Sequence, residues 1–378
     1  MPKPEISIVK DELGALVGEY NLKSNILGKN EAQTRLSLID PFWEILGWNV
    51  RDPIQVKVEK TIRASELDFS DDEKRGNKRA DYTFFTGFNK EAFVVEAKKP
   101  KVSLHDEKVI NQLKKYGFTM EIDVGILHDF EEFRPFDTAF PVTNHPEAHL
   151  IKEFDIEYQQ YPDYAEKLLN TFGREAVLDG SIQELVGRVR RGKPVIKMDE
   201  IFLDLMGVWR RKLAEGLAHY NPDYSDHDIN EYVGRILNRI IFLRVVEARN
   251  AIPTGSLETE WNRYQKEFKY GVKIKLIDKL MPFFEKMNDV FNGVLFKPSP
   301  LDKMRIPSNP IHDMLDEIYN PLFTYDFSVI KIEILGSIYE RFLGEVIIRD
   351  EKTTKIDVIQ KPEVKKSWRR VLHTKIYC

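Results

Sequence analysis

Cysteine is nearly absent from this chain. Among its 378 residues there is one cysteine, Cys378, and it is the last residue. A disulfide within the chain requires two cysteines and a thiolate zinc site requires several, so both are excluded. Because disulfides accumulate in oxidising compartments, their absence favours a cytoplasmic protein.

Long apolar runs and an excess of basic charge are lacking as well. No segment approaches the ~20 apolar residues of a membrane span, and the start MPKPEISIVKDELG has no apolar signal-peptide core. We therefore expect no membrane partner. The net charge of −4 excludes a uniformly basic surface but leaves room for a local basic groove.

Hydrophobic periodicity predicts an α/β arrangement in the first part of the chain. Residues 30–48 carry Leu36, Ile39, Trp43 and Leu46 on one stripe, which is typical of a helix. A second helix is expected at 104–117. Apolar or alternating runs predict strands at 54–62, 80–86, 92–97, 122–129 and 131–137. Pro135 would place the last strand at a sheet edge. The sequence thus predicts a small mixed β-sheet flanked by helices.

The second part of the chain has a different pattern of apolar residues. Strand patterns nearly vanish, and residues 198–219 and 228–249 carry apolar residues at helical spacing. We expect an α-helical bundle here. The predicted domains are 1–150 for the α/β part, 151–195 for a linker, 196–348 for the helical part and 349–378 for a tail.

An acid and an acid–lysine pair stand at the ends of two predicted strands. Asp81 opens one strand, and Glu96 ends the next, so on antiparallel strands the two carboxylates can lie opposite each other. Adjacent carboxylates repel unless a cation lies between them, and Mg²⁺ is held by carboxylates, carbonyls and water. The backbone carbonyl of Ala97 is a candidate third ligand. Alternation puts Lys98 on the same strand face as Glu96, where a lysine can orient or deprotonate water.

The same pattern can also arise without a metal site. An Asp followed by Glu-x-Lys is common by chance, and charged strand ends also protect against aggregation. The position of Glu96 favours a site, because it directly follows the apolar run Ala92-Phe93-Val94-Val95.

Three further residues are candidates for the same site. Gln112 and Tyr116 are four residues apart on one helical face, so an amide and a phenol can act together on phosphate or on the lysine. The alternative is a solvated face with an amphipathic tyrosine. Glu31 is a third candidate, and its alternative is an acid that stabilises a helix start.

The ordered set Asp81, Glu96-x-Lys98 and Gln112-x-x-x-Tyr116 resembles the PD-(D/E)xK nuclease superfamily, in the branch with the Q-x-x-x-Y motif. The stretches NEAQTRLSLIDPFWEILGW, RADYTFF, VVEAKKP, QLKKYG and GILHDFEEFRPFD resemble the N-terminal nuclease region of type IIG restriction–modification enzymes. Type I R subunits have a related domain. The stretches NRIIFLRVVEARN and ILGSIYERFLGEVI resemble the helical connector of type IIG enzymes.

This resemblance implies a restriction deoxyribonuclease that acts on double-stranded DNA and leaves a 5′-phosphate. It implies that Asp81 and Glu96 bind Mg²⁺ (with Mn²⁺ as a substitute), that Lys98 is the catalytic lysine, and that Gln112 and Tyr116 assist; Glu31 matches the helical acid of that branch. DNA binding through phosphates should weaken steeply with salt. Candidate phosphate contacts near the site are Lys78, Arg79, Lys99, Lys101, Lys114 and Lys115.

The end of the chain departs from the type IIG pattern. Type IIG connectors lead into a methyltransferase that opens with a stretch like Gly-Gly-Val-Tyr-Tyr-Thr-Pro, whereas KPEVKK is followed here by SWRRVLHTKIYC. One choice of codons for this tail, read one nucleotide later, encodes Ala-Gly-Gly-Val-Tyr-Tyr-Thr-Pro. We therefore expect residues 367–378 to be out of frame and the chain to lack methyltransferase and target-recognition parts; a genuine short protein is the alternative. No S-adenosylmethionine site is found, so a separate methyltransferase or specificity polypeptide is a candidate partner.

Further functional classes stay open. The chain could be a non-catalytic DNA-binding or scaffold subunit, or an R subunit of a type I system, although motor motifs are absent. Hydrolases of a different type and nucleotide enzymes are disfavoured, because there is no GxxxxGK[ST], GxSxG or HExxH motif.

Overall fold

The computed structural model describes most of the chain and divides it into two compact units. The described residues are 4–58, 80–87, 90–195, 197–252, 257–272, 274–291, 295–330, 336, 345–349 and 356–360. Of these, the first unit contains the residues up to 195 together with 324–329, and the second contains 197–323 and the described residues from 330 onward.

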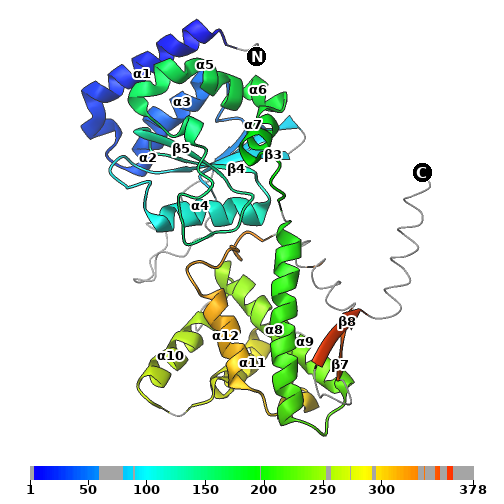
Figure 1. Ribbon diagram of the computed structural model, residues 1–378. Coiled ribbons are helices and arrows are strands. Elements are labelled where there is room, and N and C mark those ends of the chain that lie inside the picture. Colours follow the sequence, from blue (N-terminus) through cyan, green and yellow to red (C-terminus); the bar gives the residue numbers. More distant parts are fainter. Residues whose placement is uncertain are drawn as a thin grey trace, which may run out of the picture. The chain divides into compact units, whose positions relative to one another are not determined.

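A six-stranded mixed sheet forms the centre of the first unit (Figure 1). Its strands lie in chain order: β1 Val56–Val58, β2 Tyr82–Thr86, β3 Lys90–Ala97, β4 Val124–His128, β5 Glu132–Asp137 and β6 Ile156–Glu157. All neighbours are antiparallel except β3 and β4, which are parallel. Helix α4 (Glu107–Met120) connects these two strands and lies against one face of the sheet. The predicted mixed sheet flanked by helices is confirmed.

Two apolar clusters lie on opposite faces of this sheet. The larger one packs α1 (Ile6–Leu27), α3 (Asp40–Ile45) and α5 (Tyr161–Phe172) against the strands, and the smaller one packs α4 against the other face. Side chains of β3 alternate between them: Phe93 and Val95 belong to the larger cluster and Val94 to the smaller. Glu96 therefore points to the α4 face of the sheet.

The predicted helix at 30–48 is interrupted by a π-helical turn. It consists of α2 (Glu31–Thr34), the π-turn η1 (Arg35–Ile39) and α3. The wider turn shifts the faces of the helix, so Leu36, predicted to be in the core, is 63% exposed, whereas Leu38 is buried. Arg35, at the start of the π-turn, is buried as well.

The sheet corrects two further predictions. β5 is not an edge strand, because β6 pairs with its residues Glu132 and Phe133. Pro135 is tolerated because it lies beyond this short pairing. At the other edge, β1 has three residues, and of its expected apolar stripe only Val56 is buried.

Residues 151–195 are a part of the first unit rather than the predicted linker. They form α5, α6 (Arg174–Leu178) and α7 (Ser181–Arg190), and their apolar side chains belong to the larger cluster. The amphipathic pattern of these helices is what places them there: Leu168, Leu169 and Phe172 of α5 are buried.

The second unit is mainly helical, as predicted. Its helices are α8 (Met198–Tyr220), α9 (Asp226–Ala248), α10 (Leu257–Lys269), α11 (Leu276–Phe291) and α12 (Ser308–Ile318). A hairpin of β7 (Glu345–Arg349) and β8 (Ile356–Gln360) was not expected. The expected out-of-frame tail at 367–378 lies outside the described residues. No helix in the described part of the chain is both long and apolar enough to cross a membrane.

Candidate active site

The ends of β2 and β3 bring the predicted acids together. Tyr82 of β2 pairs with Val95 of β3, and Asp81 directly precedes Tyr82. Continuing this antiparallel register by one residue sets Asp81 opposite Glu96. The sequence-based prediction of this pairing agrees with the register.

The carboxylate of Asp81 is fixed on both of its oxygens. Arg35 Nη1 donates a hydrogen bond to Asp81 Oδ1 at 2.9 Å. The backbone N–H of Ala97 donates to Asp81 Oδ2 at 2.8 Å. The second bond crosses from β3 to the start of β2, so it holds the Asp81 side chain at the end of β3.

Glu96 is a nearly buried acid with two donors on one oxygen. Its exposed fraction is 6%. Lys98 Nζ donates to Glu96 Oε1 at 2.5 Å, and Gln112 Nε2 of α4 donates to the same oxygen at 3.1 Å. Burial, and then repulsion from Asp81, raise the pKa of Glu96 to about 7, although Lys98 opposes the shift. The site thus holds negative charge that its own residues do not fully compensate.

The Lys98 ammonium contacts two oxygen atoms of the site. Besides Glu96 Oε1, it donates to the backbone carbonyl of Ala97 at 3.2 Å. Burial would lower the pKa of Lys98, but Glu96 outweighs it with help from Asp81 and Glu31, so the pKa is raised and the amine is protonated at neutral pH. The strand end itself is anchored, since Lys98 N donates to the His128 carbonyl at 3.0 Å.

Glu31 belongs to the same electrostatic neighbourhood. Burial raises the pKa of Glu31; Lys98 lowers it and Asp81 raises it further. These influences require that Glu31 lie near both groups. Its position at the first residue of α2 is set by Asn30, whose side chain caps the helix by accepting from Gln33 N.

The donor set fits a hard divalent cation. Asp81, Glu96 and the carbonyl of Ala97 offer the oxygen ligands that Mg²⁺ prefers. The Lys98 ammonium hydrogen-bonds to two of these three oxygen donors, so a positive charge is already favoured at this place. Among the described residues no group of three or more His, Cys, Asp or Glu could hold a metal ion, so a site here depends on the backbone carbonyl and on water.

The remaining predicted residues fall into different environments. Tyr116 is buried and its ring belongs to the smaller apolar cluster. Lys99 and Lys101 are exposed just beyond β3, and Lys115 is partly exposed. Lys78 and Arg79 lie outside the described residues.

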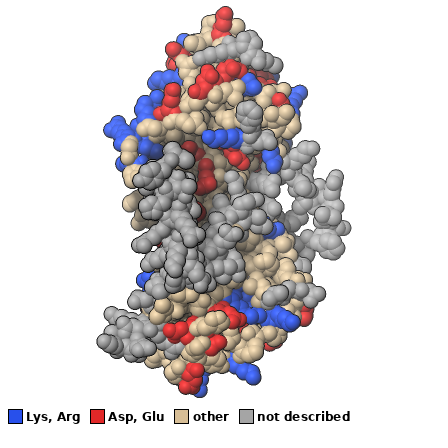
Figure 2. Space-filling model, turned by 90° about the vertical axis from the view of Figure 1, so that its right-hand side faces the viewer, with Lys and Arg blue, Asp and Glu red and all other residues tan. Residues whose placement is uncertain are grey.

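Lys114 corrects the predicted DNA contacts. Its side chain is 0% exposed, and its Nζ donates to the carbonyls of Pro146 and Ala148 at 3.4 and 3.0 Å. A lysine that satisfies backbone carbonyls in the interior is not available to phosphate. On the face drawn in Figure 2, both basic and acidic side chains are exposed.

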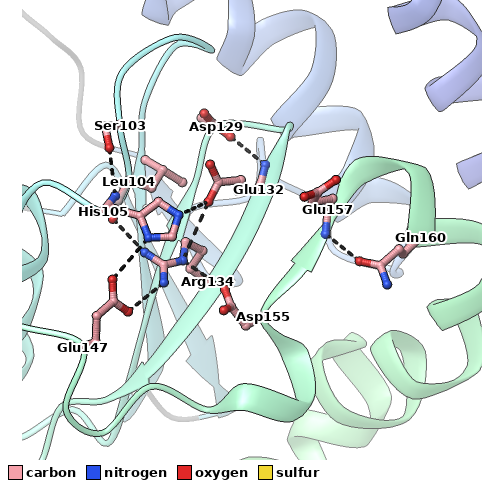
Figure 3. A network of polar contacts seen from close by, with 10 residues as sticks. All are labelled: Ser103, Leu104, His105, Asp129, Glu132, Arg134, Glu147, Asp155, Glu157 and Gln160. Atoms are coloured by element: carbon pink, nitrogen blue, oxygen red, sulfur yellow. Dashed lines mark hydrogen bonds and ion pairs between the residues drawn. The ribbon is translucent and has the colours of Figure 1, made fainter.

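A polar network holds the segment that leads from Lys98 to α4 (Figure 3). Arg134 of β5 donates to the Leu104 carbonyl at 3.0 Å, to Glu147 at 2.7 Å and to Asp155 at 2.9 Å. His105 lies between Glu132 and Glu147, with ring nitrogens 3.1 and 3.3 Å from their carboxylate oxygens. The network fixes the connection between the strand of Glu96 and the helix of Gln112.

Sequence reasoning missed Arg35 and its neighbours. Arg35 Nε donates to the Tyr82 hydroxyl at 3.3 Å, and that hydroxyl donates to Asp40 Oδ1 at 2.5 Å. The only feature of the sequence that connects Arg35 with the site is its position one helical turn after the candidate residue Glu31.

A comparison with known proteins relates the chain to restriction enzymes. It is similar to the type II restriction enzyme and methyltransferase RM.Eco57I of Escherichia coli. The two are 29% identical over 357 residues, which cover 90% of this chain and 34% of that protein. The chain thus spans about a third of the length of this curated relative. No family model and no solved structure matches the chain. The similarity supports the predicted relation to type II restriction–modification enzymes.

Proposed function

We propose that the first unit is a divalent-metal-dependent endonuclease module that hydrolyses DNA phosphodiester bonds, with the PD-(D/E)xK arrangement that the sequence resembles. The observation that carries the proposal is the convergence of Asp81, Glu96 and Lys98 at adjacent strand ends. The similarity to a restriction enzyme supports the same class of reaction.

In this proposal, Asp81, Glu96 and the Ala97 carbonyl would hold Mg²⁺. A bound Mg²⁺ would supply Lewis-acid chemistry and stabilise negative charge on the phosphate. Asp81 is suited to this role because Arg35 and Ala97 N fix its orientation before any ligand binds. Glu31, whose charge is coupled to Lys98 and Asp81, would help to orient water.

Lys98 and Gln112 would act on the reacting groups and on Glu96. The Lys98 ammonium can donate a hydrogen bond to a phosphate oxygen, because it needs only to turn from its present acceptors, Glu96 and the Ala97 carbonyl. Gln112 keeps a neutral donor on Glu96 when Lys98 turns away. Tyr116 supports α4 from within the smaller cluster. Exposed Lys99 and Lys101, with Lys115, are the remaining candidates for phosphate contacts.

Plasmid cleavage by the purified chain tests the proposal. Supercoiled DNA incubated with Mg²⁺ or Mn²⁺ should be nicked or linearised by the wild type, and S-adenosylmethionine should not change the rate. Asp81→Asn and Lys98→Ala should abolish cleavage. Lys108→Ala is the matched control, because it removes an exposed lysine of α4 that is not a candidate phosphate contact and leaves the three converging groups intact. Equal cleavage by wild type and Lys98→Ala would refute the assignment and favour a DNA-binding or scaffold role.

A further inference from the structure

We propose that Arg35 is the positioning residue of the metal site: its guanidinium, held by the π-turn η1 and Tyr82, sets the orientation of the Asp81 carboxylate. The proposal rests on the function proposed above. It adds a residue that contacts neither the metal nor the substrate and acts on the metal through its contacts with Asp81.

The contacts of Arg35 are directed and buried. Its side chain is 11% exposed and that of Asp81 is 14% exposed, so the pair is shielded from solvent. Nη1 donates to Asp81 Oδ1 at 2.9 Å, and Nη2 reaches the Asp81 carbonyl at 3.5 Å. The guanidinium therefore contacts both the side chain and the backbone of the same residue.

A second set of contacts fixes the guanidinium itself. Nε donates to the Tyr82 hydroxyl at 3.3 Å, and the guanidinium carbon lies 4.7 Å from the centre of the Tyr82 ring. The hydroxyl in turn donates to Asp40 Oδ1 at 2.5 Å. A chain of contacts thus runs from Asp40 of α3 through Tyr82 and Arg35 to Asp81.

The π-turn gives this chain its geometry. Arg35 begins η1 and Asp40 directly follows it. Arg35 is buried at the start of this wider turn, and π-turns are found frequently at functional sites.

The planar fork of arginine is essential to this role. Lysine keeps the positive charge, but its single ammonium cannot reach Asp81 Oδ1, the Asp81 carbonyl and the Tyr82 hydroxyl together. Arg35→Lys therefore removes the contacts that orient the Asp81 carboxylate but keeps the positive charge at position 35. If Arg35 acted only through its charge, this variant would bind metal as the wild type does.

Calorimetric titration of the full chain with Mn²⁺ alone, without DNA, tests the proposal. Asp81→Asn should weaken binding by at least about tenfold, and Arg35→Lys should weaken it about tenfold, the range typical of groups that orient metal ligands. In the double variant, Arg35→Lys should add nothing to Asp81→Asn, because its effect passes through the Asp81 carboxylate. Arg188→Lys is the control, since Arg188 forms an exposed ion pair with Glu153.

The outcomes separate this proposal from the function on which it rests. If Asp81→Asn leaves Mn²⁺ binding unchanged, the proposed metal site fails. The role of Arg35 is refuted if Asp81→Asn weakens Mn²⁺ binding but folded Arg35→Lys does not. It is also refuted if Mn²⁺ affinity in the double variant falls by the product of the two single-variant factors. Should Arg35→Lys not fold, Tyr82→Phe replaces it: loss of the hydroxyl that anchors Nε should weaken binding about twofold to threefold, and only when Asp81 is present. A wild-type affinity in Tyr82→Phe would then overturn the proposal.

Discussion

The Lys98 ammonium lies between the Glu96 carboxylate and the Ala97 carbonyl, 2.5 Å from Glu96 Oε1 and 3.2 Å from the carbonyl oxygen. These are two of the three oxygen donors proposed to hold a metal ion. The ammonium therefore satisfies the same acceptors that a cation would need. A metal ion and Lys98 compete for these acceptors, and the competition makes their two roles separable by experiment.

Replacement of Lys98 by methionine should abolish cleavage without abolishing metal binding. Lys98→Met removes the ammonium that pairs with Glu96, so Mn²⁺ should bind with equal or higher affinity in a calorimetric titration. Plasmid cleavage should fall at least about 100-fold, because the group that acts on phosphate or water is lost.

Lys99→Met provides the matched control for Lys98→Met. Lys99 is the next residue and is exposed, so its loss should leave Mn²⁺ binding unchanged. The loss of Mn²⁺ binding in Lys98→Met, with the protein still folded, would contradict the competition between lysine and metal.

The Arg134 network should be worth more to stability than a surface ion pair. Arg134 has 2% side-chain exposure, and its removal leaves the buried Leu104 carbonyl without this donor. Arg134→Met should lower the free energy of unfolding by about 2–3 kcal/mol, or the melting temperature of the first unit by about 5–10 °C.

Arg188→Met is the comparison for Arg134→Met. Arg188 is 60% exposed in its pair with Glu153, and the loss of such a pair changes stability by no more than about 0.5 kcal/mol. Equal melting temperatures for the two variants, measured by circular dichroism, would show that the network of Figure 3 does not stabilise the fold.

The sequence predicted those parts of the site whose positions follow from the pairing of two adjacent strands, β2 and β3. Alternation along β3 and the spacing from Asp81 to Glu96 specify which side chains share a face and an edge. Gln112 was assigned to the same site because it precedes Tyr116 by four residues on one helical face, and because this pair resembles the Q-x-x-x-Y motif.

The parts that were missed depend on packing between distant segments. The π-turn at Arg35 cannot be recognised from the spacing of the apolar residues, because one wider turn shifts the apolar face of the helix by only one residue. Lys114 was predicted to contact DNA phosphate because of its charge, but its acceptors in the interior are carbonyls of residues 146 and 148, more than thirty positions away in the sequence. Residues 151–195 were predicted to be a linker because their helices are short. Their apolar faces have a partner only once the sheet against which they pack is known.

Gly117 controls how closely α4 approaches the sheet. A Cβ at this position would lie 2.3 Å from Thr138 Oγ1 and 2.5 Å from Thr138 Cβ, and Thr138 is buried. Gly117→Ala should therefore destabilise the protein by about 1–3 kcal/mol, as overpacking does. Because α4 would shift away from the sheet, the bond from Gln112 to Glu96 should weaken and cleavage should slow.

Gly187→Ala tests the opposite expectation within the same unit. Gly187 lies in α7, and a Cβ there would meet nothing within 4 Å. The substitution should stabilise the protein by about 0.5–1 kcal/mol, because alanine is the better helix former. Thermal melts in which Gly117→Ala is as stable as Gly187→Ala would show that α4 can move without penalty.

Asp129 makes stability depend on pH in a defined window. It is buried at the end of β4, and its Oδ1 accepts from Glu132 N at 2.8 Å. Burial raises its pKa from 3.8 to about 7; the Glu132 N–H opposes the shift, and Glu132 and Glu131 add to it. Because the folded state holds the proton more tightly than the unfolded state, the stability present below about pH 4 is lost progressively as pH rises to about 7.

Asp129→Asn should remove this dependence. Asparagine keeps the oxygen acceptor for Glu132 N but never ionises, so the variant should match the wild type near pH 4 and be more stable above pH 7 by up to about 4 kcal/mol. Melting temperatures measured from pH 4 to pH 8 check this, with Asp11→Asn on the exposed face of α1 as the control. A constant difference between wild type and Asp129→Asn across that range would mean that Asp129 does not titrate there, and that burial does not govern its ionisation.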